Sequence, residues 1–215
     1  LNEAIAMGSE HLSSYEVIYE EDTPLYEQLQ AGKANVDEDL ACAMYEELVE
    51  RAAKAGFQQY EVANFACNRS LNYQPSTLNF PSHACLHNVN YWRGGSFYGL
   101  GPSATSYVRG VRTKTFSNTQ RYCEQLEQGL RAIESREELA PLSRAGETAA
   151  FGLRMVAGWP FEQFRQVTGY DLRQEWAEEM NQLVRQGWGC LRPDRFHLTP
   201  QGLRFADAAA QLFLR

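Results

Sequence analysis

Three things are missing from this chain of 215 residues, and each absence excludes a class of protein. It has no run of about 18 apolar residues, the length that a membrane-crossing helix needs. Positive charge is scarce, because 20 Lys and Arg stand against 27 Asp and Glu. The net charge of −7 argues against general nucleic-acid binding, which requires a basic face. The N-terminal residues 1–5 also lack the charged start and apolar core of a signal peptide.

Cysteine is present in an odd number and is widely scattered, so a secreted disulfide framework is not expected. The five cysteines are Cys42, Cys67, Cys85, Cys123 and Cys190. This usage favours a reducing, cytoplasmic location. With 44% hydrophobic and 22% charged residues the chain is typical of a globular protein. It begins without Met, and residues 1–8 resemble the end of a helix, so we expect the C-terminal part of a longer protein.

The first half predicts a strand, a helix and a second strand. Ser14–Tyr19 is rich in β-branched and aromatic residues and predicts a strand. Asp37 is a suitable N-cap for a helix that Gly56 would end. Gln58–Val62 predicts the second strand. This order is typical of a β-α-β unit in a parallel sheet, whose first strand would have an unpaired edge for a missing N-terminal half or a homodimer mate.

The last third is mostly helical, and we place a domain boundary between residues 116 and 117. Asn118 is a suitable cap for one helix and Asp171 for another. Arg192-Pro193-Asp194 separates two short strands, and Thr199-Pro200 begins a final helix. Residues 117–215 therefore predict a helical, winged-helix-like domain. Its would-be recognition helix, residues 171–186, carries two Arg against four acidic residues, which argues against DNA binding.

His87-Asn88-Val89-Asn90-Tyr91-Trp92 is the segment richest in chemistry. A neutral imidazole is the usual axial ligand of haem iron, and aromatic side chains supply apolar pocket walls. Asn88 would orient the His87 imidazole, while Tyr91 and Trp92 would shape the pocket. Spacing alone favours the other interpretation, a buried, hydrogen-bonded histidine in a turn beside a core tryptophan.

Two further patterns are weaker. His83, Cys85 and His87 alternate, so a strand would place them on one face and, with Cys67, would suggest zinc. No CxxC pair supports that alternative. Gly99-Leu100-Gly101-Pro102-Ser103-Ala104 allows positive φ or a close approach of backbone to a ligand, and a plain tight turn is the other interpretation.

Taken together, several segments resemble the HemW/HemN-type radical-SAM proteins, the oxygen-independent coproporphyrinogen oxidase-like group. The resemblance runs nearly from end to end. It rests on Leu12–Val17 with Glu20–Pro24, on Asp37–Asp39 with Met44, Tyr45, Leu48, Gly56 and Phe57, and on Tyr60–Ala66, His87–Trp92 and Gly99–Ala104.

The resemblance implies the C-terminal part of a partial (β/α)6 barrel at residues 1–116, followed by the helical domain. In the family an upstream CxxxCxxC motif holds a [4Fe–4S] cluster that binds S-adenosylmethionine. The motif is absent from this chain, so we expect the chain alone to be inactive and name no catalytic residue in it.

The His-Asn-x-x-Tyr-Trp segment resembles the haem-chaperone branch, which implies haem binding and transfer to a haem-accepting protein. His87 is then the candidate iron ligand, and Asn88, Tyr91, Trp92, Gly99, Gly101 and Ala104 are the other candidate binding residues. The alternative function is oxygen-independent coproporphyrinogen III oxidase. The chain departs from the family at Leu86, where Arg is usual, and in the 22 residues that separate Asn64 from His87.

Overall fold

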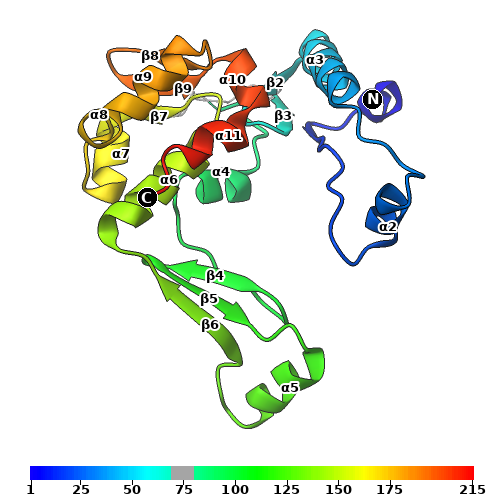
Figure 1. The fold of residues 1–215 in the computed structure, drawn as a ribbon, viewed down its shortest axis with the longest axis vertical. Coiled ribbons are helices and arrows are strands. Elements are labelled where there is room, and N and C mark those ends of the chain that lie inside the picture. The colour runs from blue at the N-terminus through cyan, green and yellow to red at the C-terminus, as the bar shows by residue number, and fades with distance from the viewer. Residues whose placement is uncertain (69–79) are drawn as a thin grey trace. The chain divides into compact units, whose positions relative to one another are not determined.

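The computed structural model describes residues 1–68 and 80–215, which form two compact units, Leu1–Ala84 and Cys85–Arg215 (Figure 1). Part of the long stretch before His87 thus lies outside the described residues. The fold is mixed α/β. Among the described residues each sheet has three strands and none closes into a barrel. No helix in this part of the chain is both long and apolar enough to cross a bilayer.

The first unit is a small antiparallel sheet with one long helix against it. Its elements are α1 (Asn2–Ala6), β1 (His11–Ser13), α2 (Pro24–Gln30), α3 (Glu38–Lys54), β2 (Phe57–Gln59) and β3 (Asn64–Cys67). The strand order is β1-β3-β2. Ala52 of α3 packs on Phe57, Phe65 and Cys67 to form its core.

The predicted α3 is confirmed, with the Asp37 carboxylate accepting a hydrogen bond of 2.9 Å from the amide of Leu40. The predicted parallel pairing is wrong. In the sheet β3 lies between β1 and β2, so the strands before and after α3 do not pair with each other. Both β1 and β2 run antiparallel to β3, so they share a direction without being hydrogen-bonded neighbours.

The strand predicted at Ser14–Tyr19 is also wrong, because β1 ends at Ser13. The Ser14 amide makes one more hydrogen bond, of 2.9 Å, to the Ala63 carbonyl. Beyond that point β3 has no residues left to pair with, since the chain turns there towards β2. Tyr15, Val17 and Ile18 are consequently exposed.

The second unit contains two three-stranded sheets and most of the helices. Its elements are α4 (Leu86–Trp92), β4 (Thr105–Val108), β5 (Val111–Thr115), α5 (Thr119–Glu127), β6 (Ile133–Glu138), α6 (Pro141–Gly152), β7 (Trp159–Pro160), α7 (Phe161–Thr168), α8 (Leu172–Glu175), α9 (Ala177–Arg185), β8 (Gly189–Leu191), β9 (Arg195–Leu198), α10 (Pro200–Arg204) and α11 (Ala206–Gln211). The sheets are ordered β4-β5-β6 and β7-β9-β8.

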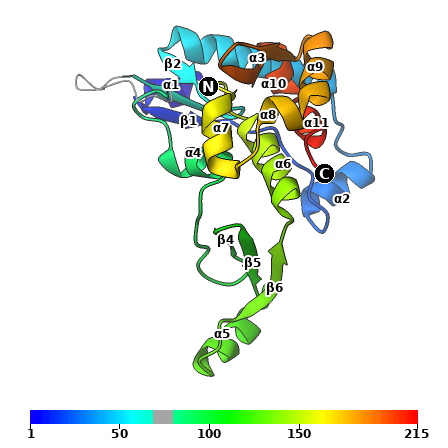
Figure 2. The ribbon, with the colours of Figure 1, turned by 90° about the vertical axis from the view of Figure 1, so that its left-hand side faces the viewer.

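Helix α6 is the centre of this unit and contacts α4, α7 and α11 (Figure 2). The sheet β4-β5-β6 precedes α6 and carries α5 at its far end (Figure 1). Aromatic rings fill the core beside α6, and all of them are fully buried: Trp159, Phe164, Trp176, Phe196 and Phe213.

In this unit, the helix starts predicted from Asn118 and Thr199 as capping residues are confirmed. Asn118 accepts from the Arg121 amide at 2.9 Å, and Thr199 accepts from the Gly202 amide at 3.0 Å. The hairpin around Arg192-Pro193-Asp194 is confirmed as β8 and β9. The helix capped by Asp171 is interrupted at Trp176, which separates α8 from α9. The winged-helix-like arrangement and the boundary at residues 116 and 117 stay predictions.

Candidate functional site

The segment that carries His87 is a short helix. This helix, α4, runs to Trp92 and is followed by a turn at Arg93 and Gly94. His87 and Tyr91 are four residues apart and share one face of α4. Their rings meet edge to face, with 4.7 Å between centroids and 68° between planes.

Tyr91 in turn stacks on Phe97, with 4.0 Å between centroids and 29° between planes. The main chain of Phe97 is fixed to β4 by two hydrogen bonds. Its amide donates to the Tyr107 carbonyl at 2.7 Å, and its carbonyl accepts from the Tyr107 amide at 2.9 Å. The Phe97 and Tyr107 rings lie 6.1 Å apart. A ladder of rings therefore leads from His87 through Tyr91 and Phe97 to the sheet.

The imidazole of His87 is exposed, and within residues 1–68 and 80–215 it takes part in no hydrogen bond or ion pair. Among these residues, nothing occupies either ring nitrogen, and an imidazole nitrogen can bind a metal ion. The buried, hydrogen-bonded histidine that spacing alone allowed is not what the structure has. His87 is instead an accessible imidazole oriented by an aromatic neighbour.

The zinc alternative is not supported. The part of the chain that the structure describes contains no group of three His, Cys, Asp or Glu side chains able to hold a metal ion. His83 lies 3.4 Å from the carboxylate of Glu10. The alternation of His83, Cys85 and His87 does not place them on one face of a strand, because α4 begins directly after Cys85.

Trp92 is separated from His87 by five residues and by about 140° around α4. Its ring packs against α6, 6.3 Å from the ring of Phe151 and 5.0 Å below the guanidinium of Arg154. Its indole Nε1 is buried and finds no hydrogen-bond acceptor among the described residues. Asn88 is half-buried, and in the same residues no hydrogen bond joins it to His87. The structure thus brings Tyr91 to His87, whereas Trp92 fastens α4 to α6.

The loop Gly99–Ala104 is shaped by the protein's own backbone. A Cβ atom added to Gly99 would lie 2.3 Å from the Thr105 carbonyl oxygen, so the close approach that glycine allows here is to β4. Gly101 has φ of +95° and its Cβ position is open. The Thr115 hydroxyl donates to the Gly101 carbonyl at 2.7 Å and accepts from the Ala104 amide at 3.0 Å. Sequence reasoning missed Thr115, because it also missed the sheet that carries it.

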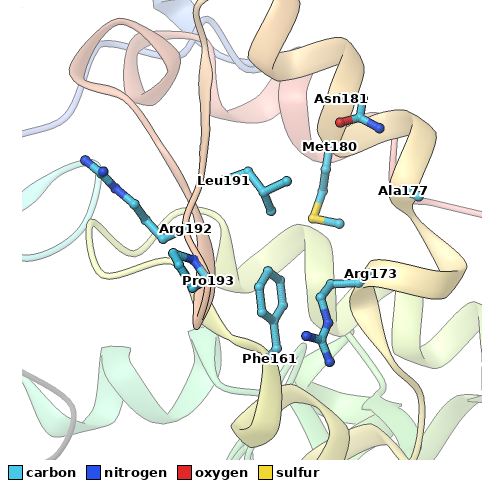
Figure 3. A pocket seen from close by; sticks show the side chains of 8 residues that line it. All are labelled: Phe161, Arg173, Ala177, Met180, Asn181, Leu191, Arg192 and Pro193. Carbon is cyan, nitrogen blue, oxygen red and sulfur yellow. The ribbon is translucent and has the colours of Figure 1, made fainter.

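A separate shallow groove of about 540 Å³ lies between α9, the start of α7 and the β8–β9 hairpin (Figure 3). Phe161, Met180 and Leu191 form its apolar floor, and Arg173 borders it. Arg173 is paired with Asp171, Nη2 to Oδ2 at 2.9 Å. No histidine or cysteine lines this groove, and none of the residues predicted to bind a cofactor lies in it.

Comparisons with known proteins show what this chain is similar to. Residues 139–205 match the family described as HemN C-terminal domain. The chain is 26% identical to the heme chaperone HemW of Lactococcus lactis, over 95% of this chain and 50% of that protein. It is 32% identical to the heme chaperone HemW of Synechocystis, over 76% of this chain and 37% of that protein.

A vertebrate relative and a solved structure agree with these matches. The mitochondrial radical S-adenosyl methionine domain-containing protein 1 of Danio rerio is 30% identical over 74% of this chain and 35% of its own length. The coproporphyrinogen III oxidase HemN of Escherichia coli, described as a radical SAM enzyme, has the same fold with a TM-score of 0.69 at 12% identity. That match covers 99% of this chain and 49% of the enzyme. The chain spans between 35% and 53% of the length of the curated relatives it matches.

Proposed function

Because this chain belongs to the HemW/HemN-type radical-SAM proteins, we propose that it contributes the haem-binding part of a haem chaperone, with His87 as the iron ligand. The observation that carries the proposal is the exposed imidazole of His87, which rests on the ring of Tyr91 and makes no hydrogen bond to any described residue. Imidazole nitrogen is a strong donor to haem iron. An exposed ligand also suits a chaperone, since its cargo must leave again.

The surroundings of His87 in sequence suit a porphyrin. Leu86, Tyr98 and Leu100 are exposed by 77%, 78% and 90%, so their apolar surface is available to a ligand. Porphyrin faces are large and apolar, and covering them with such side chains is favourable. Leu86 also stands where the family usually has Arg, which makes this stretch more apolar.

The other candidate residues take supporting roles in this proposal. Tyr91 orients the imidazole, and Trp92 sets the position of α4 through its contacts with Phe151 and Arg154. Gly99, Gly101 and Ala104 lie in the loop whose resemblance to the family implies a place near the S-adenosylmethionine end of the barrel, and they would approach that ligand through main-chain atoms. The [4Fe–4S] cluster and S-adenosylmethionine belong to the full-length protein, because CxxxCxxC does not occur in this chain.

The remaining expectations extend the same proposal. A haem-accepting protein would take the cargo, and the five free thiols support a reducing, cytoplasmic setting. Tyr15, Val17 and Ile18 expose between 60% and 74% of their surface. An N-terminal half or a second copy of the chain would cover them.

The test is haem titration of the full-length protein followed by the Soret band. We expect His87→Ala to raise the haem dissociation constant at least about tenfold, equivalent to about 1.4 kcal/mol, and added imidazole to restore the band. His83→Ala is the matched control, because His83 is partly exposed but already lies beside Glu10. Equal haem affinity and an equal Soret band in wild type and His87→Ala would remove His87 as the ligand.

The second candidate function is oxygen-independent coproporphyrinogen III oxidase, which the structural likeness to HemN favours. In that case the chain would hold a porphyrinogen, and the radical chemistry would need the cluster half of the protein. Anaerobic assays of the reconstituted full-length protein with coproporphyrinogen III decide between the two. Production of protoporphyrinogen would favour the oxidase, and its absence beside measured haem transfer would favour the chaperone.

A further inference from the structure

We infer that Phe97 is a positioning residue that acts on the iron ligand through Tyr91. The inference rests on the proposed function, in which His87 binds haem iron. Phe97 lies outside the His-Asn-x-x-Tyr-Trp segment, and no pattern in the sequence singles it out. Its role follows from how the rings of His87, Tyr91 and Phe97 are arranged.

The Tyr91 ring is confined on two sides. The imidazole of His87 meets it at 68° and 4.7 Å, and Phe97 stacks on it at 29° and 4.0 Å. Offset-stacked and edge-to-face pairs are the two favoured arrangements of aromatic rings. With Phe97 in place, Tyr91 has little freedom to turn, so the surface that it presents to His87 is constant.

Phe97 is suited to this task because its own position is fixed by main-chain and turn contacts. Its amide and carbonyl both pair with Tyr107 on β4. Two hydrogen bonds attach the turn before Phe97 to α4. The Asn90 side-chain amide donates to the Ser96 carbonyl at 3.1 Å, and the Gly95 main-chain amide donates to the Asn90 carbonyl at 2.9 Å. A Cβ atom on Gly95 would lie 2.0 Å from the Asn90 side-chain oxygen, so the attachment of the turn to α4 through Asn90 requires glycine at this position.

The consequence concerns the orientation of the imidazole. His87 is exposed, and the described residues offer its ring nitrogens no hydrogen bond to hold them. Most metal-bound histidines are oriented by a hydrogen bond to the second ring nitrogen. Here the edge-to-face contact with Tyr91 takes that place, and Phe97 supports it from behind.

The experiment compares Phe97→Ala, Phe97→Leu and Phe97→Tyr in the full-length protein. Losing the ring should weaken haem binding about three- to tenfold, the value of one aromatic pair, and should shift the balance of high-spin and low-spin ferric haem. Phe97→Leu keeps most of the volume and should behave like Phe97→Ala. Phe97→Tyr keeps the stacked ring and should restore both the affinity and the spin state.

The same measurements in a His87→Ala background separate positioning from general stability. If Phe97 acts through His87, the double variant His87→Ala, Phe97→Ala binds haem with the same affinity as His87→Ala alone. Equal losses in both backgrounds, or wild-type affinity and spin state in Phe97→Ala and Phe97→Leu, would overturn the positioning role while leaving His87 as the ligand. Unchanged haem binding in His87→Ala alone would instead overturn the proposed function. Circular dichroism and thermal melts of each variant report whether the fold is intact.

Discussion

The guanidinium of Arg93 lies 4.6 Å from the ring centre of Trp159 and donates to the Gly158 carbonyl at 2.7 Å. Arg93 directly follows α4 and is only 8% exposed. Burial, and secondarily the charge of Arg195, lowers the pKa of Arg93 to about 10. These contacts tie the end of the helix that carries His87 to the core of the second unit.

We therefore expect Arg93→Ala to lower the free energy of unfolding by about 2–4 kcal/mol, because a charged hydrogen bond and a cation–π contact are both lost. Arg93→Lys should lose less, since an ammonium can still lie over the indole. Urea unfolding followed by circular dichroism measures both. Arg185→Ala, at an exposed position, is the control and should change stability by no more than about 0.5 kcal/mol.

Substitution by alanine should destabilise the protein by different amounts at Gly99 and at Gly101. Gly99→Ala places a methyl group against the Thr105 backbone, which cannot yield without moving β4, so a loss of about 2–4 kcal/mol is expected. Gly101→Ala meets open space and pays only for positive φ, about 1 kcal/mol. Thermal melts of the two variants rank them, and an equal or reversed order would contradict the close contact between Gly99 and the Thr105 backbone.

The sequence predicts those parts of the fold that a single side chain specifies. Asp37, Asn118 and Thr199 each cap a helix with their own oxygen, so the residue type alone marks the helix start. Helix α4 has no such mark, since Cys85 makes no side-chain cap bond and only Val89 is buried along it. The sequence therefore does not predict the helix that carries His87, although the His-Asn-x-x-Tyr-Trp motif does identify His87 itself.

The sheet β4-β5-β6 was missed for a different reason. All six residues of β6 are exposed, so no alternation of apolar and polar residues marks it as a strand. Pairing with β5 defines it, including an ion pair between Arg112 and Glu137. Contacts of this kind join residues far apart in sequence and cannot be recognised from one segment. Thr115 and Phe97 went unnoticed because both depend on this sheet.

Arg112 also joins the sheet to α6, which gives a prediction about coupling. Its Nη2 donates to both carboxylate oxygens of Glu147 at 2.7 Å. In a double-mutant cycle of Arg112→Ala and Glu147→Ala we expect a coupling energy of about 1–2 kcal/mol, because the two-oxygen contact is partly shielded from water. The control cycle on Arg136 and Glu138, which are both exposed, should give less than about 0.5 kcal/mol. Equal coupling in the two cycles would mean that the Arg112–Glu147 contact is not the one that joins sheet and helix.

In the first unit, His11 should make stability depend on pH. Its Nε2 lies 2.9 Å from the Tyr60 hydroxyl, and burial lowers its pKa below the ordinary value of 6.5. The folded protein thus binds a proton at His11 less tightly than the unfolded chain does. Protonation consequently favours unfolding, so the contribution of neutral His11 is fully present above pH 6.5 and is lost as pH falls through the folded-state pKa.

The measurement is urea unfolding of wild type and His11→Gln between about pH 5 and 8, combined with NMR titration of the His11 ring. Glutamine cannot titrate, so the stability of wild type relative to the variant should fall with acidification. A difference that stays constant over this range, or a ring pKa at or above 6.5, would mean that the His11 imidazole keeps its water contact and that burial does not hold it in its neutral form.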